Sequence, residues 1–174
     1  EKVTDKDGKV AKKQLLDADG NPVTAETEFV PDDTYGTVDV TFAFDASDLK
    51  AKDKVVAFES LSLNGKELAS HADIEDKSQT VTITKPALST TAVDGLDADK
   101  NLIGEGDVTI VDTVKYKNVT PGKTYKVSGT LYEKVTDKDG KVAKKQLLDA
   151  DGNPVTAETE FVPDDTYGTV DVTF

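Results

Sequence analysis

The chain has 174 residues, of which 32% are charged and 36% hydrophobic, and it carries a net charge of −13. All 21 basic residues are lysine, and this acidic balance argues against a nucleic-acid-binding surface, because phosphate contacts need a basic patch. The sequence has no cysteine and one histidine, so disulfides are excluded and no metal centre is expected. It contains no apolar run long enough for a membrane span, and we expect no cofactor.

Residues 1–42 open the chain with a sequence that recurs without a change 132 residues later, at 133–174. This period is too long for a solenoid unit and suits a whole domain repeated in tandem. The stretch TKPALSTTAVDG at 84–95 has the composition of a linker followed by a new strand. We therefore predict that residues 1–86 are the C-terminal part of one repeat and that 87–174 are the N-terminal part of the next.

Two acidic stretches inside the repeated segment, DKDGK and DADGN, are similar to part of a calcium-binding loop. Such a loop needs an acidic residue at its first position, where this sequence has Val3 in one case and Leu15 in the other. Both stretches are therefore predicted to be hairpin turns.

Short runs of alternating apolar and polar residues, separated by turn residues, predict β-strands. They are TVDVTFAFD at 37–45, KVVAFESLSL at 54–63, QTVTIT at 79–84, DVTIVDTVKY at 107–116 and KTYKVSGTLYE at 123–133. Asn64-Gly65 predicts a tight hairpin, and the only short helical turn expected is at 45–53. The pattern is typical of an all-β, immunoglobulin-like antiparallel β-sandwich that serves as a tandem stalk repeat.

Two carboxylates interrupt these apolar strands. Asp112 lies in strand alternation with Ile110 and Val114, whose face should point into the core, and Glu59 follows the apolar run 55–58. A buried carboxylate is unfavourable unless it is paired or protonated. Either residue alone is readily explained as a carboxylate at a strand edge, but both together, with a single histidine, favour a functional site.

That histidine, His71, lies in the stretch HADIEDKSQTVTI, eight residues before Gln79. The simpler interpretation is a solvated histidine in a surface loop. The alternative is that His71 and Gln79 belong to one reacting site, since imidazole is the only side chain here with an ordinary pKa near neutrality.

Several of these segments resemble a known family. They are VVAFE at 55–59, HADIEDKSQT at 71–80, LSTTAVDG at 88–95 and IVDTVKYKNVTPGKTYKVSGTLYE at 110–133. Together they resemble the VaFE repeat, the Thr–Gln ester-bond domain of Gram-positive surface adhesins and pilus-like stalks. The resemblance covers nearly the whole repeat. It implies an immunoglobulin-like domain in which an ester joins a threonine on the first strand to a glutamine on the last, assisted by a histidine and two carboxylates.

Carried over to this chain, the resemblance places the cross-link between Thr90 and Gln79. Thr91 stays open as the neighbouring alternative, and Thr113 is a third candidate. A Lys–Asn isopeptide is a further alternative, for which the sequence offers two lysines and an asparagine, namely Lys115, Lys117 and Asn118.

The resemblance also implies that His71, Glu59 and Asp112 assist the reaction. We expect His71 to accept the threonine proton, and a protonated Glu59 or Asp112 to donate a hydrogen bond to the Gln79 carbonyl. Loss of ammonia then leaves the ester. This is a single self-modification of each domain, so we do not expect an enzyme with turnover.

The resemblance further implies a structural stalk module in an extracellular, cell-wall-anchored surface protein, with the signal and anchor outside these residues. Its expected partners are neighbouring repeats, with no nucleic acid or membrane, and a host ligand would be bound by another domain. A repeat that binds a host ligand directly is the alternative from a different functional class.

The predicted site is divided between two repeats. The end of one repeat holds Glu59, His71 and Gln79, and the start of the next holds Thr90 and Asp112. The residues from Gln79 to Thr90 span at most about 36–40 Å, too little to finish one strand and return the length of a domain. We therefore expect head-to-tail complementation between chains, in which residues 1–42 and 133–174 compete for one position.

Overall fold

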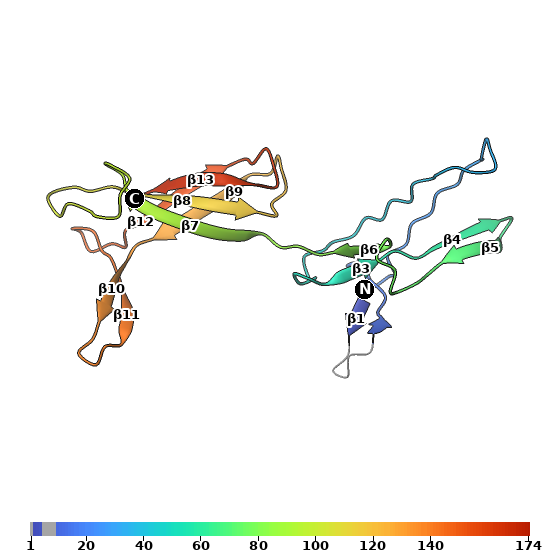
Figure 1. Cartoon of the computed structure of the whole chain (residues 1–174), viewed down its shortest axis with the longest axis horizontal. Helices are drawn as coiled ribbons and strands as arrows, with labels where there is room; N and C mark the ends of the chain where they lie inside the picture. The colour runs from blue at the N-terminus through green and yellow to red at the C-terminus, as the bar shows by residue number, and fades with distance from the viewer. Residues whose placement is uncertain (1, 5–9) are drawn as a thin grey trace. The chain divides into compact units, whose positions relative to one another are not determined.

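The computed structural model of the chain describes residues 2–4 and 10–174. These described residues form strands and turns, with no helix long and apolar enough to cross a membrane. Every strand pair among them is antiparallel, which confirms the predicted all-β fold. The chain divides into two compact units, Glu1–Lys85 and Pro86–Phe174, which are described separately below (Figure 1).

The first unit contains a four-stranded sheet and a separate hairpin. The sheet has the order β2-β1-β3-β6, with β1 at Lys2–Thr4, β2 at Val10–Lys12, β3 at Lys54–Val56 and β6 at Thr80–Thr82. The hairpin consists of β4 at Glu59–Leu63 and β5 at Lys66–His71. Its turn residues Asn64 and Gly65 both have positive φ, 49° and 76°, which confirms the predicted tight turn.

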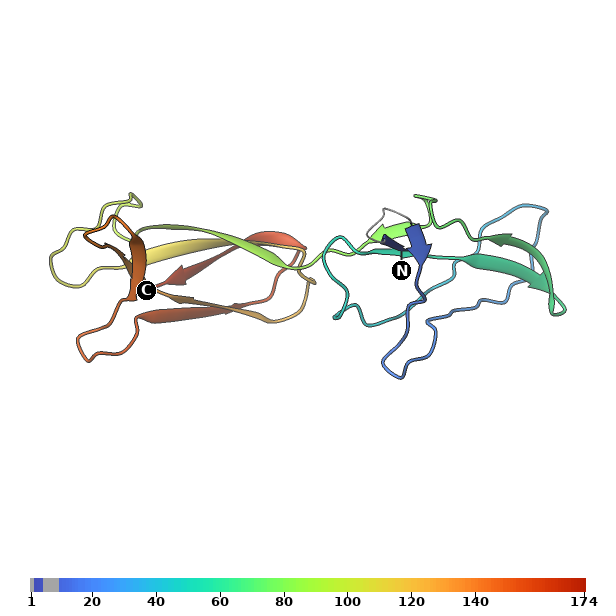
Figure 2. The same cartoon turned by 90° about the horizontal axis from the view of Figure 1, so that it is seen from below.

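The second unit contains a three-stranded sheet and two strand pairs, which can be followed in Figure 2. The sheet has the order β13-β8-β7, with β7 at Ala87–Asp94, β8 at Ile110–Lys117 and β13 at Tyr167–Thr173. The pairs are β9 (Tyr125–Thr130) with β12 (Thr156–Phe161), and β10 (Tyr132–Thr136) with β11 (Val142–Gln146).

The core of the second unit lies between its three-stranded sheet and the β9–β12 pair. Val114 and Tyr116 of β8 are buried, as is Val172 of β13. The rings of Tyr116 and Phe161 lie 4.8 Å apart and connect β8 with β12. The alternation predicted for DVTIVDTVKY is therefore confirmed within β8, where Val114 and Tyr116 point inward as expected.

The repeated sequence adopts different structures in the two units. Residues 156–161 and 167–173 form β12 and β13, whereas their identical counterparts at 24–29 and 35–41 form no strand. β12 pairs with β9 and β13 pairs with β8, and the sequences of β8 and β9 occur only once in the chain. The strand predicted at 37–45 is therefore wrong, because a strand needs a hydrogen-bonding partner.

The strand predicted at 54–63 is also divided in the structure. β3 ends at Val56 and pairs with β6, while β4 begins at Glu59 and pairs with β5. Between them, the Ala57 N–H donates to the backbone oxygen of Gln79 at 3.0 Å. The change of partner explains why one apolar run forms two strands.

The acidic stretches form turns, as predicted. In the second unit, the Gly140 N–H donates to the Asp137 backbone oxygen within DKDGK, and the Asp149 carboxylate accepts the Asn153 N–H within DADGN. The first DKDGK, at residues 5–9, lies outside the described residues. Turns also replace the short helix expected at 45–53, where the Asp45 carboxylate accepts the Ser47 N–H at 2.8 Å.

Candidate functional site

The side-chain amide of Gln79 lies at the centre of a polar cluster in the first unit. Its nitrogen Nε2 donates to Oε2 of Glu59 at 2.8 Å and to the backbone oxygen of His71 at 2.9 Å. Its oxygen Oε1 accepts the backbone N–H of Asp73 at 3.3 Å. Glu59 and His71 are themselves cross-strand neighbours on β4 and β5, so the hairpin positions both of them beside the amide.

Two backbone groups determine the orientation of this amide. The carbonyl of His71 can only accept and the N–H of Asp73 can only donate, so nitrogen and oxygen cannot be exchanged. Glu59 therefore contacts the nitrogen that would leave as ammonia. We expected a protonated Glu59 or Asp112 to donate to the Gln79 carbonyl oxygen. In the structure, Glu59 contacts the amide nitrogen instead, and the N–H of Asp73 donates to the oxygen.

The structure brings to His71 a residue that the sequence analysis did not single out. Nε2 of His71 lies 3.0 Å from Oδ2 of Asp76. The Ser78 hydroxyl and N–H both donate to Asp76 at 2.7 Å, and these bonds, with a smaller contribution from His71, hold the pKa of Asp76 below its ordinary value. The five-residue spacing from His71 to Asp76 gave no periodic signal, because both lie at or beyond the end of β5.

The other predicted residues, Thr90 and Asp112, lie in the second unit on one face of the three-stranded sheet. Thr90 pairs with Val114, and Asp112 pairs with Ala92 on one side and Val172 on the other. Cross-strand partners share a face, so Thr90 and Asp112 lie on the face that carries the buried Val114 and Val172. Thr90 itself is exposed, so this part of the face is open.

The alternative nucleophiles lie on the opposite face. Thr91 pairs with Thr113, and Thr113 pairs in turn with Asp171. The Thr113 hydroxyl donates to Oδ1 of Asp171 at 2.7 Å. Only Thr90, of these three threonines, shares a face with Asp112.

Asp112 has an unusual environment. Among the described side chains that are not exposed, its Oδ1 is the buried polar atom without a hydrogen-bond partner. A buried carboxyl oxygen without a partner is unfavourable, and such groups are often functional. The carboxylate that interrupts the apolar face of this strand in the sequence is therefore partly buried in the sheet, with one oxygen atom unpaired.

The lysines considered for an isopeptide lie away from the core. Lys115 and Lys117 are exposed and alternate with Thr113 on the outer face of β8. Asn118 follows directly, with a positive φ of 59°. Nothing in this arrangement shields a lysine–asparagine pair from water.

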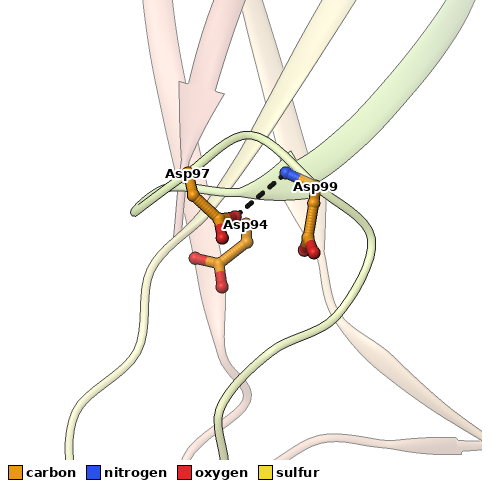
Figure 3. Close-up of side chains that lie close together, drawn as sticks. All are labelled: Asp94, Asp97 and Asp99. Carbon is orange, nitrogen blue, oxygen red and sulfur yellow. Dashed lines mark hydrogen bonds between the residues drawn. The ribbon is translucent and has the colours of Figure 1, made fainter.

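An acidic loop after β7 also draws together three carboxylates, those of Asp94, Asp97 and Asp99 (Figure 3). Their oxygens lie within 4.8 Å of one another. Asp97 accepts the Asp99 N–H at 3.1 Å, and Asp94 accepts the Leu96 N–H at 2.8 Å. These bonds account for the conformation of the loop, which contains none of the predicted site residues.

The predicted site residues thus form two groups, one in each unit. Comparison of the sequence with known protein families provides independent evidence. One family model, described as T-Q ester bond containing domain, matches the chain twice, over residues 4–83 and 86–174. No curated protein and no solved structure gives a significant match.

Proposed function

The chain belongs to the family of T-Q ester bond containing domains. On this premise we propose that an ester joins the first and last strands of each repeat, between the threonine at the position of Thr90 and the glutamine at the position of Gln79. The family is one of cross-linked structural modules, typical of extracellular surface proteins. We further propose that the module is an immunoglobulin-like stalk repeat of a cell-wall-anchored adhesin whose host ligand is bound by another domain.

The observation that carries this proposal is the set of hydrogen bonds around the Gln79 amide. Its leaving nitrogen contacts two acceptors, Glu59 and the His71 carbonyl, while a backbone N–H from Asp73 contacts its oxygen. A donor held at the carbonyl oxygen stabilises the negative charge that develops when a nucleophile attacks.

In the proposed reaction, Oγ of Thr90 attacks Cδ of Gln79. The hydroxyl proton passes to Nδ1 of His71, because Asp76 accepts the Nε2–H and so fixes the tautomer. The Asp73 N–H stabilises the tetrahedral oxyanion. The Cδ–Nε2 bond then breaks, the nitrogen takes a proton from the imidazolium and leaves as ammonia, and the Thr90 Oγ–Gln79 Cδ ester remains.

The two other acids have separate roles in this proposal. Glu59 orients the leaving nitrogen and favours its protonation through the contact at 2.8 Å. Asp112 shares the face of Thr90, and its unpaired Oδ1 is suited to a proton or hydrogen bond supplied when the site closes. Neither group is consumed, but each domain reacts once, so the chemistry is self-modification.

Such an ester provides mechanical and thermodynamic stabilisation. It closes nearly the whole repeat into one covalent loop, which restricts the unfolded chain as a long-loop disulfide does, by about 4–5 kcal/mol in the chain-entropy model. It also transmits tension between the first and last strands without separating the sheet. Apolar packing around the bond would exclude hydrolytic water.

The test uses a complete repeat in native order, made by joining residues 87–174 to residues 43–86. The junction Phe174–Ala43 reproduces the natural Phe42–Ala43 sequence, because 133–174 repeats 1–42. We expect the folded protein to weigh one ammonia less than its sequence, and Gln79→Ala to abolish the loss. If the difference between measured mass and sequence mass is the same in both proteins, the ester is rejected.

A further inference from the structure

Residues 71–80 connect β5 with β6 through two consecutive turns (Figure 1). In the first turn, the Asp76 N–H donates to the Asp73 backbone oxygen at 3.1 Å. In the second turn, the Thr80 N–H donates to the Lys77 backbone oxygen at 3.3 Å. The connection contains the amide, the base and the oxyanion donor of the proposed reaction, so its conformation determines where these groups lie.

The carboxylate of Asp73 holds the first turn. Its Oδ1 accepts the backbone N–H of Glu75 at 2.9 Å, a two-residue spacing that is typical of an Asx turn. The backbone N–H of Asp73 itself donates to Oε1 of Gln79 at 3.3 Å. Because the bond to Glu75 restricts the backbone conformation at Asp73, it also restricts how the Asp73 N–H approaches the amide oxygen.

The hydroxyl of Thr80 ties the same connection to strand β6. Its Oγ1 donates to the backbone oxygen of Asp76 at 2.6 Å. Thr80 is half-buried and pairs with Val56 of β3, so its own position is set by the sheet. Asp76 in turn lies 3.0 Å from Nε2 of His71. The hydroxyl therefore connects the sheet to the carboxylate that orients the proposed base.

We propose that the Asp73 carboxylate and the Thr80 hydroxyl are positioning groups for ester formation. The first holds the oxyanion donor against the Gln79 amide, and the second holds Asp76 against His71. Each acts through a bond to a backbone atom of the connection, so neither exchanges a proton in the reaction. This inference rests on the proposed function and adds to it two side-chain groups that the reaction scheme does not use.

The size of the expected effects follows from geometry. A displacement of about 1 Å in a reacting group can slow a reaction about 100-fold. Removal of a whole oxyanion donor costs about 10²–10³-fold. Loss of a group that only positions such a donor, or only positions the residue beside the base, should cost less. We therefore expect slowing of roughly 10-fold when either side-chain group is removed.

The charge of Asp73 separates positioning from electrostatic stabilisation. A negative carboxylate near a developing oxyanion raises the energy of the transition state, because like charges repel. Asp73 can therefore assist the reaction only as a hydrogen-bond acceptor for Glu75. A neutral acceptor at this position should serve at least as well.

The test for Thr80 measures the rate of ammonia loss in the joined repeat by time-resolved intact mass after refolding. Thr80→Val keeps the β-branched shape but removes the hydroxyl, and we expect it to slow the reaction roughly 10-fold. Thr80→Ser restores the hydroxyl and should restore the rate. Thr82→Val is the matched control, because Thr82 is an exposed residue of the same strand, and it should react at the rate of the unmodified joined repeat.

A second set of variants tests Asp73 in the same assay. Asp73→Ala is expected to slow the reaction roughly 10-fold, whereas Asp73→Asn retains an acceptor oxygen and should react at an equal or higher rate. Asp45→Ala is the matched control, because the Asp45 carboxylate accepts the Ser47 N–H with the same two-residue spacing in its own turn. It should leave the rate unchanged.

The outcomes distinguish this inference from the proposed function. If the unmodified joined repeat retains its ammonia, the proposed function is overturned, and the inference with it. If the joined repeat loses ammonia and Thr80→Val or Asp73→Ala reacts at the same rate, the positioning role of that residue is overturned and the proposed function stands. Slowing by Asp73→Asn equal to that by Asp73→Ala would also overturn the role of Asp73. Circular dichroism establishes that each variant is folded, and the Asp73 set decides if Thr80→Val does not fold.

Discussion

His71 and Asp76 form a histidine–carboxylate pair, with 3.0 Å between Nε2 and Oδ2. The contact leaves Nδ1 as the nitrogen available to accept a proton, and a carboxylate in this position also stabilises the imidazolium that results. Asp76 is thus a positioning residue for the proposed base.

Replacing Asp76 with asparagine is expected to slow ester formation in the joined repeat by roughly 10–100-fold, at or below the lower end of the 10²–10⁴-fold that general acid–base catalysis typically contributes, because Asp76 acts only through His71. Time-resolved intact mass after refolding measures the rate. Asp149→Asn is the matched control, because the Asp149 carboxylate also accepts backbone hydrogen bonds, but these come from Asp151 and Asn153 in its own turn. Equal slowing by both variants would contradict a role for the His71–Asp76 pair.

The loop around Asp76 should resist acid. Ser78 holds the pKa of Asp76 below its ordinary value of about 3.9. A depressed folded-state pKa stabilises the fold above the unfolded pKa, and this contribution is lost as the pH falls through the folded value. We expect NMR titration of Asp76 to show a midpoint below the ordinary value, and Ser78→Ala to move it upward. An unchanged midpoint in Ser78→Ala would contradict this cause.

Glu59→Gln should separate orientation from acid–base chemistry. The glutamine oxygen can still accept the hydrogen bond from Gln79 Nε2, but it can no longer bind or release a proton. We expect the joined repeat to fold normally and to form the ester roughly 100-fold more slowly, since general acid–base assistance is lost. An unchanged rate would limit Glu59 to orientation of the amide.

Threonine substitutions should identify the nucleophile by the face on which each residue lies. Thr90 shares a face with Asp112 and the core, whereas Thr91 and Thr113 lie on the outer face. Thr90→Ala is therefore expected to abolish the mass loss in the joined repeat, and Thr91→Ala and Thr113→Ala to retain it. Thr90→Ser keeps the hydroxyl and should restore the bond. Loss of the bond only in Thr91→Ala would show that the nucleophile is the neighbouring residue.

The sequence predicted best those features that depend on local pattern. Alternation placed Val114 and Tyr116 in the core and identified Asp112 as an anomaly, and Asn64-Gly65 specified a tight turn. These features arise from the period of a strand and from backbone conformations that few residues adopt.

Features that depend on distant partners could not be predicted in this way. The strand expected at 37–45 is absent, although the same residues form β13 elsewhere, because only the second unit supplies β8. Asp76 was missed for a similar reason, since its contact with His71 arises from the path of a loop rather than from spacing along a strand.

The two conformations of the repeated segment also bear on biosynthesis. Within a repeat, β8 and β9, which pair with the repeated segment, precede that segment in the chain. Gln79 and its hydrogen-bonding partners come last. The nucleophile strand can therefore be folded on its sheet while the ribosome is still adding the electrophile. Closure of the proposed bond would then wait for the final strand, so the ester would mark each repeat as fully synthesised and correctly assembled.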